Sequence, residues 1–265
     1  MSLVRILVFL AMGISCLASA DSAEIRMQLF ATQSGAAALD EGEGGGNPFA
    51  SALIELLGRE TLGIGQFQTE IIALTLQKSD GFQRPEIVGA PLGAGWQFFP
   101  KQPKEVRVAM ILMYSDYTRG RAISLPGARN DMQRIKKALT DAGFAVQTLL
   151  DPNRVEREAA LSRFSRQSAS ADVALFYTTG HGVEVEGRIY LLPGNFPVAE
   201  GERALESHGM IINNLGATLL ARKANFFLYA GCRDNPLSQW RKPPHVTEND
   251  SRLGNSVRSM SPAPK

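Results

Sequence analysis

The chain has 265 residues and a formal net charge of +2, and its charged residues make up 20% of the sequence. This near-neutral charge gives no reason to expect a nucleic acid or an acidic surface as a partner. The length permits one large domain or two small ones. Beyond the first twenty residues, no stretch is apolar enough for long enough to span a membrane.

Residues 1–20 have the pattern of a secretory signal. Arg5 precedes an apolar stretch, and the small residues Ala18–Ala20 form a cleavage motif. Cleavage there predicts a periplasmic or secreted protein that has no membrane contact afterwards. An uncleaved N-terminal anchor is the alternative. A lipoprotein at Cys16 is less favoured, because Gly13 and Ile14 fit poorly before a lipidated cysteine.

Removal of this leader leaves 265 − 20 = 245 residues and one cysteine, Cys232. A single cysteine cannot close a disulfide within the chain, and an oxidising compartment threatens its thiol. Three interpretations stay open on the count alone: a buried inert thiol, a bridge to another chain, or a nucleophile.

The predicted elements alternate between strands and helices. The part before residue 105 contains a strand, an acidic glycine-rich loop, two amphipathic helices and a short strand. From there the pattern predicts strands at 105–113, 145–150, 171–179, 188–193 and 225–231, with helices near 126–142, 152–167 and 210–223. Strands apolar on both faces, separated by helices, indicate an α/β fold with a mostly parallel sheet.

Two reactive side chains follow the ends of predicted strands. His181 lies just after one strand and Cys232 just after another. Reactive groups collect at the carboxyl edge of such sheets, and an imidazole beside a thiol is an arrangement for nucleophilic catalysis. The backbone N–H groups of Gly182 and Cys232 are candidates for an oxyanion hole. His208 and His245 lie in polar stretches typical of a surface. One cysteine and scattered histidines make no metal-ligand set, so neither metal nor cofactor is expected.

These motifs resemble the caspase-like cysteine peptidases, especially the bacterial branch near the metacaspases. The resemblance is carried by "TTGHGVEVEGRIYLLP" around His181 and by "LYAGCRDNP" around Cys232, with a separation of 232 − 181 = 51 residues. It implies a three-layer sandwich around a mostly parallel six-stranded sheet. It also implies a cysteine endopeptidase with His181 and Cys232 as its dyad, an acyl-enzyme thioester, and a protein or peptide as substrate.

The resemblance also implies a substrate pocket at Asp131 and Ala230. In metacaspase-like relatives both positions are acids that bind an arginine or lysine at the cleavage position. Here Asp131 keeps its carboxylate and position 230 is alanine. A basic preference is therefore expected to be weak. The alternative for Asp131 is a helix cap.

The first block resembles the last third of the same family. The match is "FATQSGAAALDEGEGGGNPFASALIELL", followed by "FQRPEIV". Because the family's end here precedes its beginning, we interpret the chain as a circular permutation of one domain. The predicted divisions are 1–20 signal, 21–95 the permuted C-terminal part, 96–104 linker, 105–240 the part with both reactive residues, and 241–265 a flexible tail.

The permutation predicts that the strand at 25–31 pairs with the strand at 225–229 in one sheet. Two rival interpretations remain. The chain is either a catalytically silent caspase-like module that binds peptides or partners, or one of two half-domains that complete each other between chains. The sequence leaves the substrate, the activation trigger, any need for calcium and the oligomeric state open.

Overall fold

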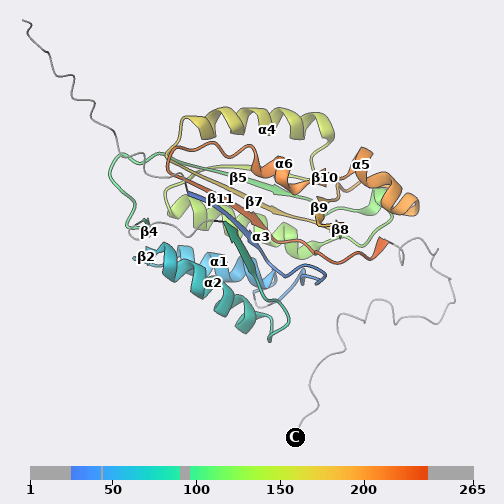
Figure 1. Ribbon diagram of the computed structural model, residues 1–265, viewed down its shortest axis with the longest axis horizontal. Helices are drawn as coiled ribbons and strands as arrows, with labels where there is room; N and C mark the ends of the chain where they lie inside the picture. Colours follow the sequence, from blue (N-terminus) through green and yellow to red (C-terminus); the bar gives the residue numbers. More distant parts are fainter. Residues whose placement is uncertain (1–24, 43, 90–95, 238–265) are drawn as a thin grey trace, which may run out of the picture.

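The computed structural model describes residues 25–42, 44–89 and 96–237 (Figure 1). The predicted signal and tail lie outside these residues. Within them, a six-stranded sheet has the order β3-β1-β11-β7-β5-β6, and two small sheets have the orders β10-β9-β8 and β2-β4. The fold is therefore the α/β arrangement that the alternating pattern predicts.

The elements follow one another with short connections. The strands are β1 (Ile25–Phe30), β2 (Leu62–Gly63), β3 (Glu86–Gly89), β4 (Gln97–Phe99), β5 (Arg107–Met113), β6 (Ala145–Leu150), β7 (Val173–Thr179), β8 (Gly182–Val185), β9 (Arg188–Leu191), β10 (Met210–Ile211) and β11 (Ala224–Tyr229). The α-helices are α1 (Pro48–Leu57), α2 (Ile64–Lys78), α3 (Pro126–Asp141), α4 (Arg154–Ala169), α5 (Leu205–His208) and α6 (Ile212–Gly216).

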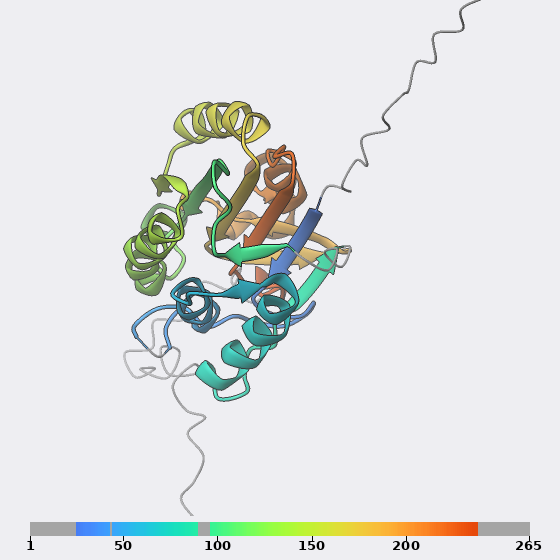
Figure 2. The same cartoon turned by 90° about the vertical axis from the view of Figure 1, so that its left-hand side faces the viewer.

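Helices cover both faces of the main sheet. Helices α1, α2 and α3 lie on one face, and α4 and α6 lie on the other (Figures 1 and 2). Every residue of β5, β7 and β11 is buried, as expected for central parallel strands with both faces covered. Each face therefore has its own apolar core, and the carboxyl ends of these strands remain for the loops that carry His181 and Cys232.

The first described strand pairs with the last one. β1 runs parallel to β11, with Ile25 opposite Ala224 and Phe30 opposite Tyr229. On its other side β1 pairs with the antiparallel edge strand β3. The pairing predicted between the two blocks is confirmed, because the early block completes the sheet of the later one. The circular permutation as the origin of this order stays a hypothesis.

Two elements differ from the sequence prediction. The helix expected at 210–223 divides into β10 and the short α6, because Met210 and Ile211 pair with β9. Residues 96–104, predicted to be a linker, contain β4, which pairs with β2. Phe98 of β4 is 1% exposed and packs against Phe226 of β11, with ring centroids 4.9 Å apart. The apolar side chains of this segment pack into a core, which its prolines and lysines do not reveal.

If β1 is part of the single sheet, shortening a buried side chain of β1 should destabilise the whole domain. Leu29 of β1 is 0% exposed and belongs to the core under α1. We expect Leu29→Ala to lower the free energy of unfolding by about 2–5 kcal/mol, because the cavity collapses only partly. Val155→Ala, at a side chain that is 76% exposed, is the control and should change it little. Urea unfolding followed by fluorescence and by circular dichroism measures both. Separate transitions for the two probes would contradict a single cooperative sheet.

Candidate active site

The loops of His181 and Cys232 lie next to each other at the carboxyl edge of the sheet. Their strands, β7 and β11, pair in parallel, so both chains leave the sheet at the same edge. The Tyr229 hydroxyl donates to the carbonyl of Cys232 at 3.0 Å. A Cβ at position 182 would lie 1.6 Å from that hydroxyl and 2.6 Å from the Cys232 carbonyl oxygen. Only glycine fits at 182, and its backbone therefore packs directly against that of Cys232.

The backbone fixes the imidazole of His181. Nε2 lies 2.7 Å from the carbonyl oxygen of Ile123. A carbonyl only accepts hydrogen bonds, so Nε2 carries the proton and Nδ1 is the basic nitrogen of the ring. The ring packs edge-on against Tyr117, with centroids 4.4 Å apart. Burial lowers the pKa of His181, although the Ile123 carbonyl opposes this shift. The imidazole is therefore neutral at neutral pH.

The thiol of Cys232 is covered by a segment from the other block. Its Sγ accepts from the N–H of Ala38 at 3.3 Å and lies 3.6 Å from the carbonyl oxygen of the same residue. Burial raises the pKa of the thiol to about 11, against a smaller opposite effect of the Ala38 hydrogen bond. This direction is opposite to that of a cysteine whose thiolate is stabilised by a neighbouring imidazole. In this state Cys232 is a protonated thiol at neutral pH.

We call residues 33–40 the covering segment. Two backbone hydrogen bonds join it to the loop of Cys232: Gly35 donates to the Arg233 carbonyl at 3.1 Å, and Arg233 donates to that of Ala36 at 2.9 Å. The segment ends at Asp40, whose carboxylate accepts from the first turn of α3, at 2.9 Å from the Gly127 nitrogen and 3.1 Å from that of Ala128. The covering segment is thus held at both ends, with Cys232 beneath its middle.

Arg233 anchors the cysteine loop to the early block. Its guanidinium pairs with Glu184 of β8 at 2.8 Å and with Glu86 of β3. It also lies 4.6 Å from the ring centroid of Phe30 in β1. The side chain is 9% exposed, so these contacts are mostly shielded from solvent. Arg233 therefore ties the loop that follows β11 to strands β1 and β3 of the early block.

Asp131 and Ala230 come close to each other, but Asp131 is already paired. Helix α3 begins at Pro126, so Asp131 lies inside it, and its interpretation as a helix cap is wrong. Its side chain is 0% exposed; it accepts from the N–H of Asn47 at 2.8 Å and pairs with Arg134 at 3.0 Å. The amide group of Asn47 also donates to the Ala230 carbonyl at 3.3 Å. Burial raises the pKa of Asp131 to about 7, although Asn47 and Arg134 oppose the shift.

The loop before α1 closes over this ion pair. A Cβ at Gly46 would lie 1.9 Å from Oδ1 of Asp131 and 2.7 Å from Nη1 of Arg134. Ala230 is 2% exposed and belongs to the apolar core. The two positions predicted to bind a basic side chain are thus brought together, but in this state an internal arginine supplies the cation.

Four contributors to the site were missed by sequence reasoning. Ile123 and Ala38 act through backbone groups, which no side-chain pattern reveals. Tyr117 accepts the N–H of His181 at 2.7 Å, and Tyr229 holds the Cys232 carbonyl. Tyr229 was detectable in principle, since in a strand that leads straight to the cysteine its alternation places its side chain on the face opposite Leu228. The others depend on loop geometry.

The burial of Cys232 beneath the covering segment predicts how the reactivity of its thiol depends on pH. A pKa raised from 9.0 to about 11 means that the thiolate fraction, and with it the rate of alkylation, rises about tenfold per pH unit beyond pH 9. We expect the iodoacetamide labelling that Cys232→Ala removes to increase steadily between pH 7 and pH 10. In urea the labelling rate of the same cysteine should level off near pH 9, because the unfolded thiol has its ordinary pKa. Labelling of the folded protein that levels off below pH 9, and that slows in His181→Ala, would instead indicate a thiolate stabilised by the imidazole.

No group of three or more His, Cys, Asp or Glu side chains suited to a metal occurs in the part of the chain that the structure describes. None of the helices in that part is both long and apolar enough to cross a bilayer. No curated protein matched the sequence. The family model described as Caspase domain matches residues 106–261, which are 156 of the 265 residues and include both His181 and Cys232. The match does not reach the early block with β1, α1 and α2. The chain belongs to the caspase domain family.

Proposed function

We propose that the protein is a cysteine endopeptidase in which Cys232 is the nucleophile and His181 the acid–base partner. The observation that carries this proposal is the fixed tautomer of His181. The Ile123 carbonyl at 2.7 Å holds the proton on Nε2, so Nδ1 is the basic nitrogen of a ring whose loop packs against the loop of Cys232. Membership of a peptidase family supports the same chemistry.

In this proposal Nδ1 of His181 removes the proton of the Cys232 thiol as the sulfur attacks the scissile carbonyl. The developing oxyanion is stabilised by the N–H groups of Gly182 and Cys232, whose backbones are in contact. The imidazolium then protonates the leaving amine, which departs as the first product. Water, deprotonated by the same imidazole, hydrolyses the thioester that remains.

The covering segment must move away before a substrate reaches the sulfur. The hydrogen bond from Ala38 and the high pKa of the thiol support a closed resting state. The same observations favour the rival function, a silent module that binds partners. The rival gives no role to the His181 tautomer, since a binding module has no use for a base at that position.

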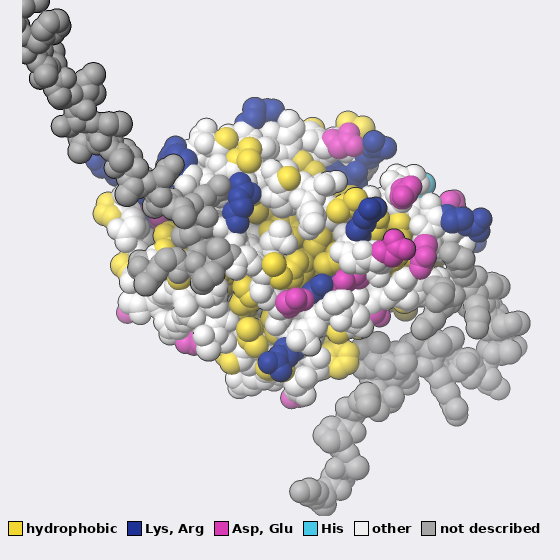
Figure 3. All heavy atoms as spheres, in the orientation of Figure 1, with side chains coloured by type: hydrophobic (Ala, Val, Ile, Leu, Met, Phe, Trp, Pro, Cys, Tyr) yellow, Lys and Arg dark blue, Asp and Glu magenta, His cyan; other side chains and the backbone are white. Residues whose placement is uncertain are grey.

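The remaining parts of the proposal come from the sequence. We propose a protein or peptide substrate outside the cytoplasm, reached after removal of residues 1–20, and a domain that arose by circular permutation. The parallel pairing of β1 with β11 supports the permutation, because both blocks contribute to one sheet. On the face drawn in Figure 3, basic and acidic side chains are interspersed, so the net charge provides no strong attraction for a polyanion.

The dyad predicts which substitutions abolish cleavage. With a fluorogenic peptide library as substrate, Cys232→Ala should remove activity, and His181→Ala should lower kcat/KM by about 10²- to 10⁴-fold. His245→Ala is the matched control, because it removes an imidazole that takes no part in the proposed chemistry, and it should retain activity. Residual cleavage by Cys232→Ala at the wild-type rate would exclude this thiol as the nucleophile. A complete lack of cleavage by the wild type would favour the binding module.

The ion pair between Arg134 and Asp131 leads to a second prediction, which concerns the preference for arginine or lysine at the cleavage position. Because Arg134 already neutralises Asp131, wild-type cleavage after arginine or lysine should be weak. Ala230→Asp should improve it and Asp131→Ala should abolish it. Arg134→Gln removes the internal cation and raises the pKa of Asp131 further, so the carboxylate can pair with a substrate cation only at alkaline pH. In alkaline assays the variant should raise kcat/KM after arginine or lysine about tenfold relative to alanine. If Asp131 is purely structural, Arg134→Gln will lower the melting temperature and leave the profile unchanged.

A further inference from the structure

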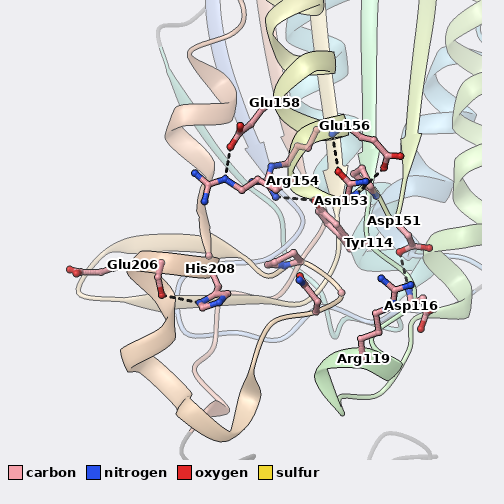
Figure 4. A pocket seen from close by; sticks show the side chains of 17 residues that line it. Tyr114, Asp116, Arg119, Asp151, Asn153, Arg154, Glu156, Glu158, Glu206 and His208 are labelled. Carbon is pink, nitrogen blue, oxygen red and sulfur yellow. Dashed lines mark hydrogen bonds and ion pairs between the residues drawn. The ribbon is translucent and has the colours of Figure 1, made fainter.

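A cavity of about 650 Å³ lies at the start of α4, on the side of the sheet that this helix covers (Figure 4). Its walls are the segment after β5 around Tyr114–Arg119, the start of α4 with its preceding loop, the residues after β9 around Pro193–Asn195, and the end of α5. We call it the α4–α5 cavity. Its volume is that of a small-molecule site, which is commonly about 300–1,000 Å³.

Most of the acidic side chains in the cavity walls already accept hydrogen bonds from other wall residues or form ion pairs with them. Asp151 accepts from the N–H groups of Ser115 and Asp116, Glu158 pairs with Arg154, and Glu156 accepts from the N–H of the residue that caps α4. The carboxylate of Glu206 points away from the other labelled side chains in Figure 4. These carboxylates therefore do not fill the cavity with uncompensated negative charge.

Two arginines in the walls have no carboxylate bonded to them. The Arg157 guanidinium donates a hydrogen bond to the neutral hydroxyl of Tyr114, at 3.3 Å. The Arg119 guanidinium forms no hydrogen bond within residues 25–42, 44–89 and 96–237, although its charge helps to lower the pKa of Asp116. A guanidinium fork matches a carboxylate in two parallel hydrogen bonds. The cavity thus offers two such forks to a ligand.

The mixture of charges narrows the class of ligand. A polyanion would meet repulsion from the five carboxylates in the walls, while a purely cationic ligand would meet three arginines. A short peptide with a free C-terminus carries a carboxylate for the arginines and N–H donors for the acids. We propose that the α4–α5 cavity binds the C-terminal carboxylate of a short peptide and that its occupancy acts on His181.

The path to His181 is short and consists of hydrogen bonds. Tyr117, between Asp116 and Arg119 in one wall, accepts the N–H of His181 at 2.7 Å and donates to the Leu192 carbonyl at 2.9 Å. Leu192, next to the wall at Pro193, donates its N–H to the His181 carbonyl at 2.8 Å. A ligand that bridges both walls therefore contacts the two segments that hold His181. This coupling rests on the proposed function of His181, whereas binding in the cavity does not.

Binding is tested on Cys232→Ala, which cannot cleave the probe. Calorimetry compares trialanine with a free C-terminus, trialanine amide and inorganic phosphate. We expect the free acid to bind and the amide to bind at least tenfold more weakly. Arg157→Gln and the exposed Arg119→Gln should each remove this difference. Arg163→Gln, further along α4, is the matched control and should keep it. Absence of binding by the free acid, equal binding of the amide, or displacement of the peptide by phosphate at equal concentration would overturn the assignment.

Coupling is read from the imidazole signals in the same protein, assigned with His181→Gln, His208→Gln and His245→Gln. His208 lines the cavity and should shift through direct contact. We expect the His181 signal to shift as well when trialanine saturates the site, and Tyr117→Phe to abolish that second shift. A stationary His181 signal at saturation would disprove the coupling while leaving the binding site intact. Failure of the protein to cleave any peptide would leave both readouts valid.

Discussion

The pairing of β1 with β11 is the interaction on which the rest of the molecule depends. β11 ends directly before the loop of Cys232, and β1 is its neighbour on one side, with β7 and the loop of His181 on the other. The neighbours of β11 therefore decide what lies above the cysteine. Because β1 leads into the covering segment, the backbone N–H of Ala38 reaches the sulfur, and Arg233 reaches back to Glu86.

The charges around the site are balanced by internal partners. Asp131 has Arg134, Arg233 has two glutamates, and Asp40 has the first turn of α3. Each of these pairs is at least partly buried, where an unpaired charge would be costly. Burial leaves the reactive residues uncharged, since it lowers the pKa of His181 and raises that of Cys232. A neutral imidazole, and a neutral thiol with the N–H of Ala38 bonded to its sulfur, describe a closed resting state.

Sequence reasoning was strongest where side-chain chemistry coincided with strand ends. His181 and Cys232 follow runs of buried apolar residues, and parallel strands bring their carboxyl ends to one edge. The joining of the two blocks was predicted from motif order and is confirmed by the register of β1 and β11. The cap interpretation of Asp131 failed because the helix already begins at Pro126, with Leu125 at its cap position. Ala38 and Ile123 could not be found, since they act through peptide groups that every residue possesses. The segment predicted to be a linker contains β4, which the sequence did not indicate. Phe98 of β4 is recognisable as a core residue only from its contact with Phe226 in the structure.

The order of the elements also determines when the domain can fold. Ile25 and Ala224 are partners in the sheet although 224 − 25 = 199 positions separate them along the chain, whereas Ala224 and Val173 are 51 apart. That is roughly two doublings of the intervening loop, or about 1 kcal/mol more closure entropy, and contacts so distant in sequence slow folding. During synthesis β1 and the covering segment emerge first and must wait for the cysteine strand. A nascent chain therefore holds neither a complete sheet nor the neighbouring loops of His181 and Cys232 until nearly all of the described residues have been made.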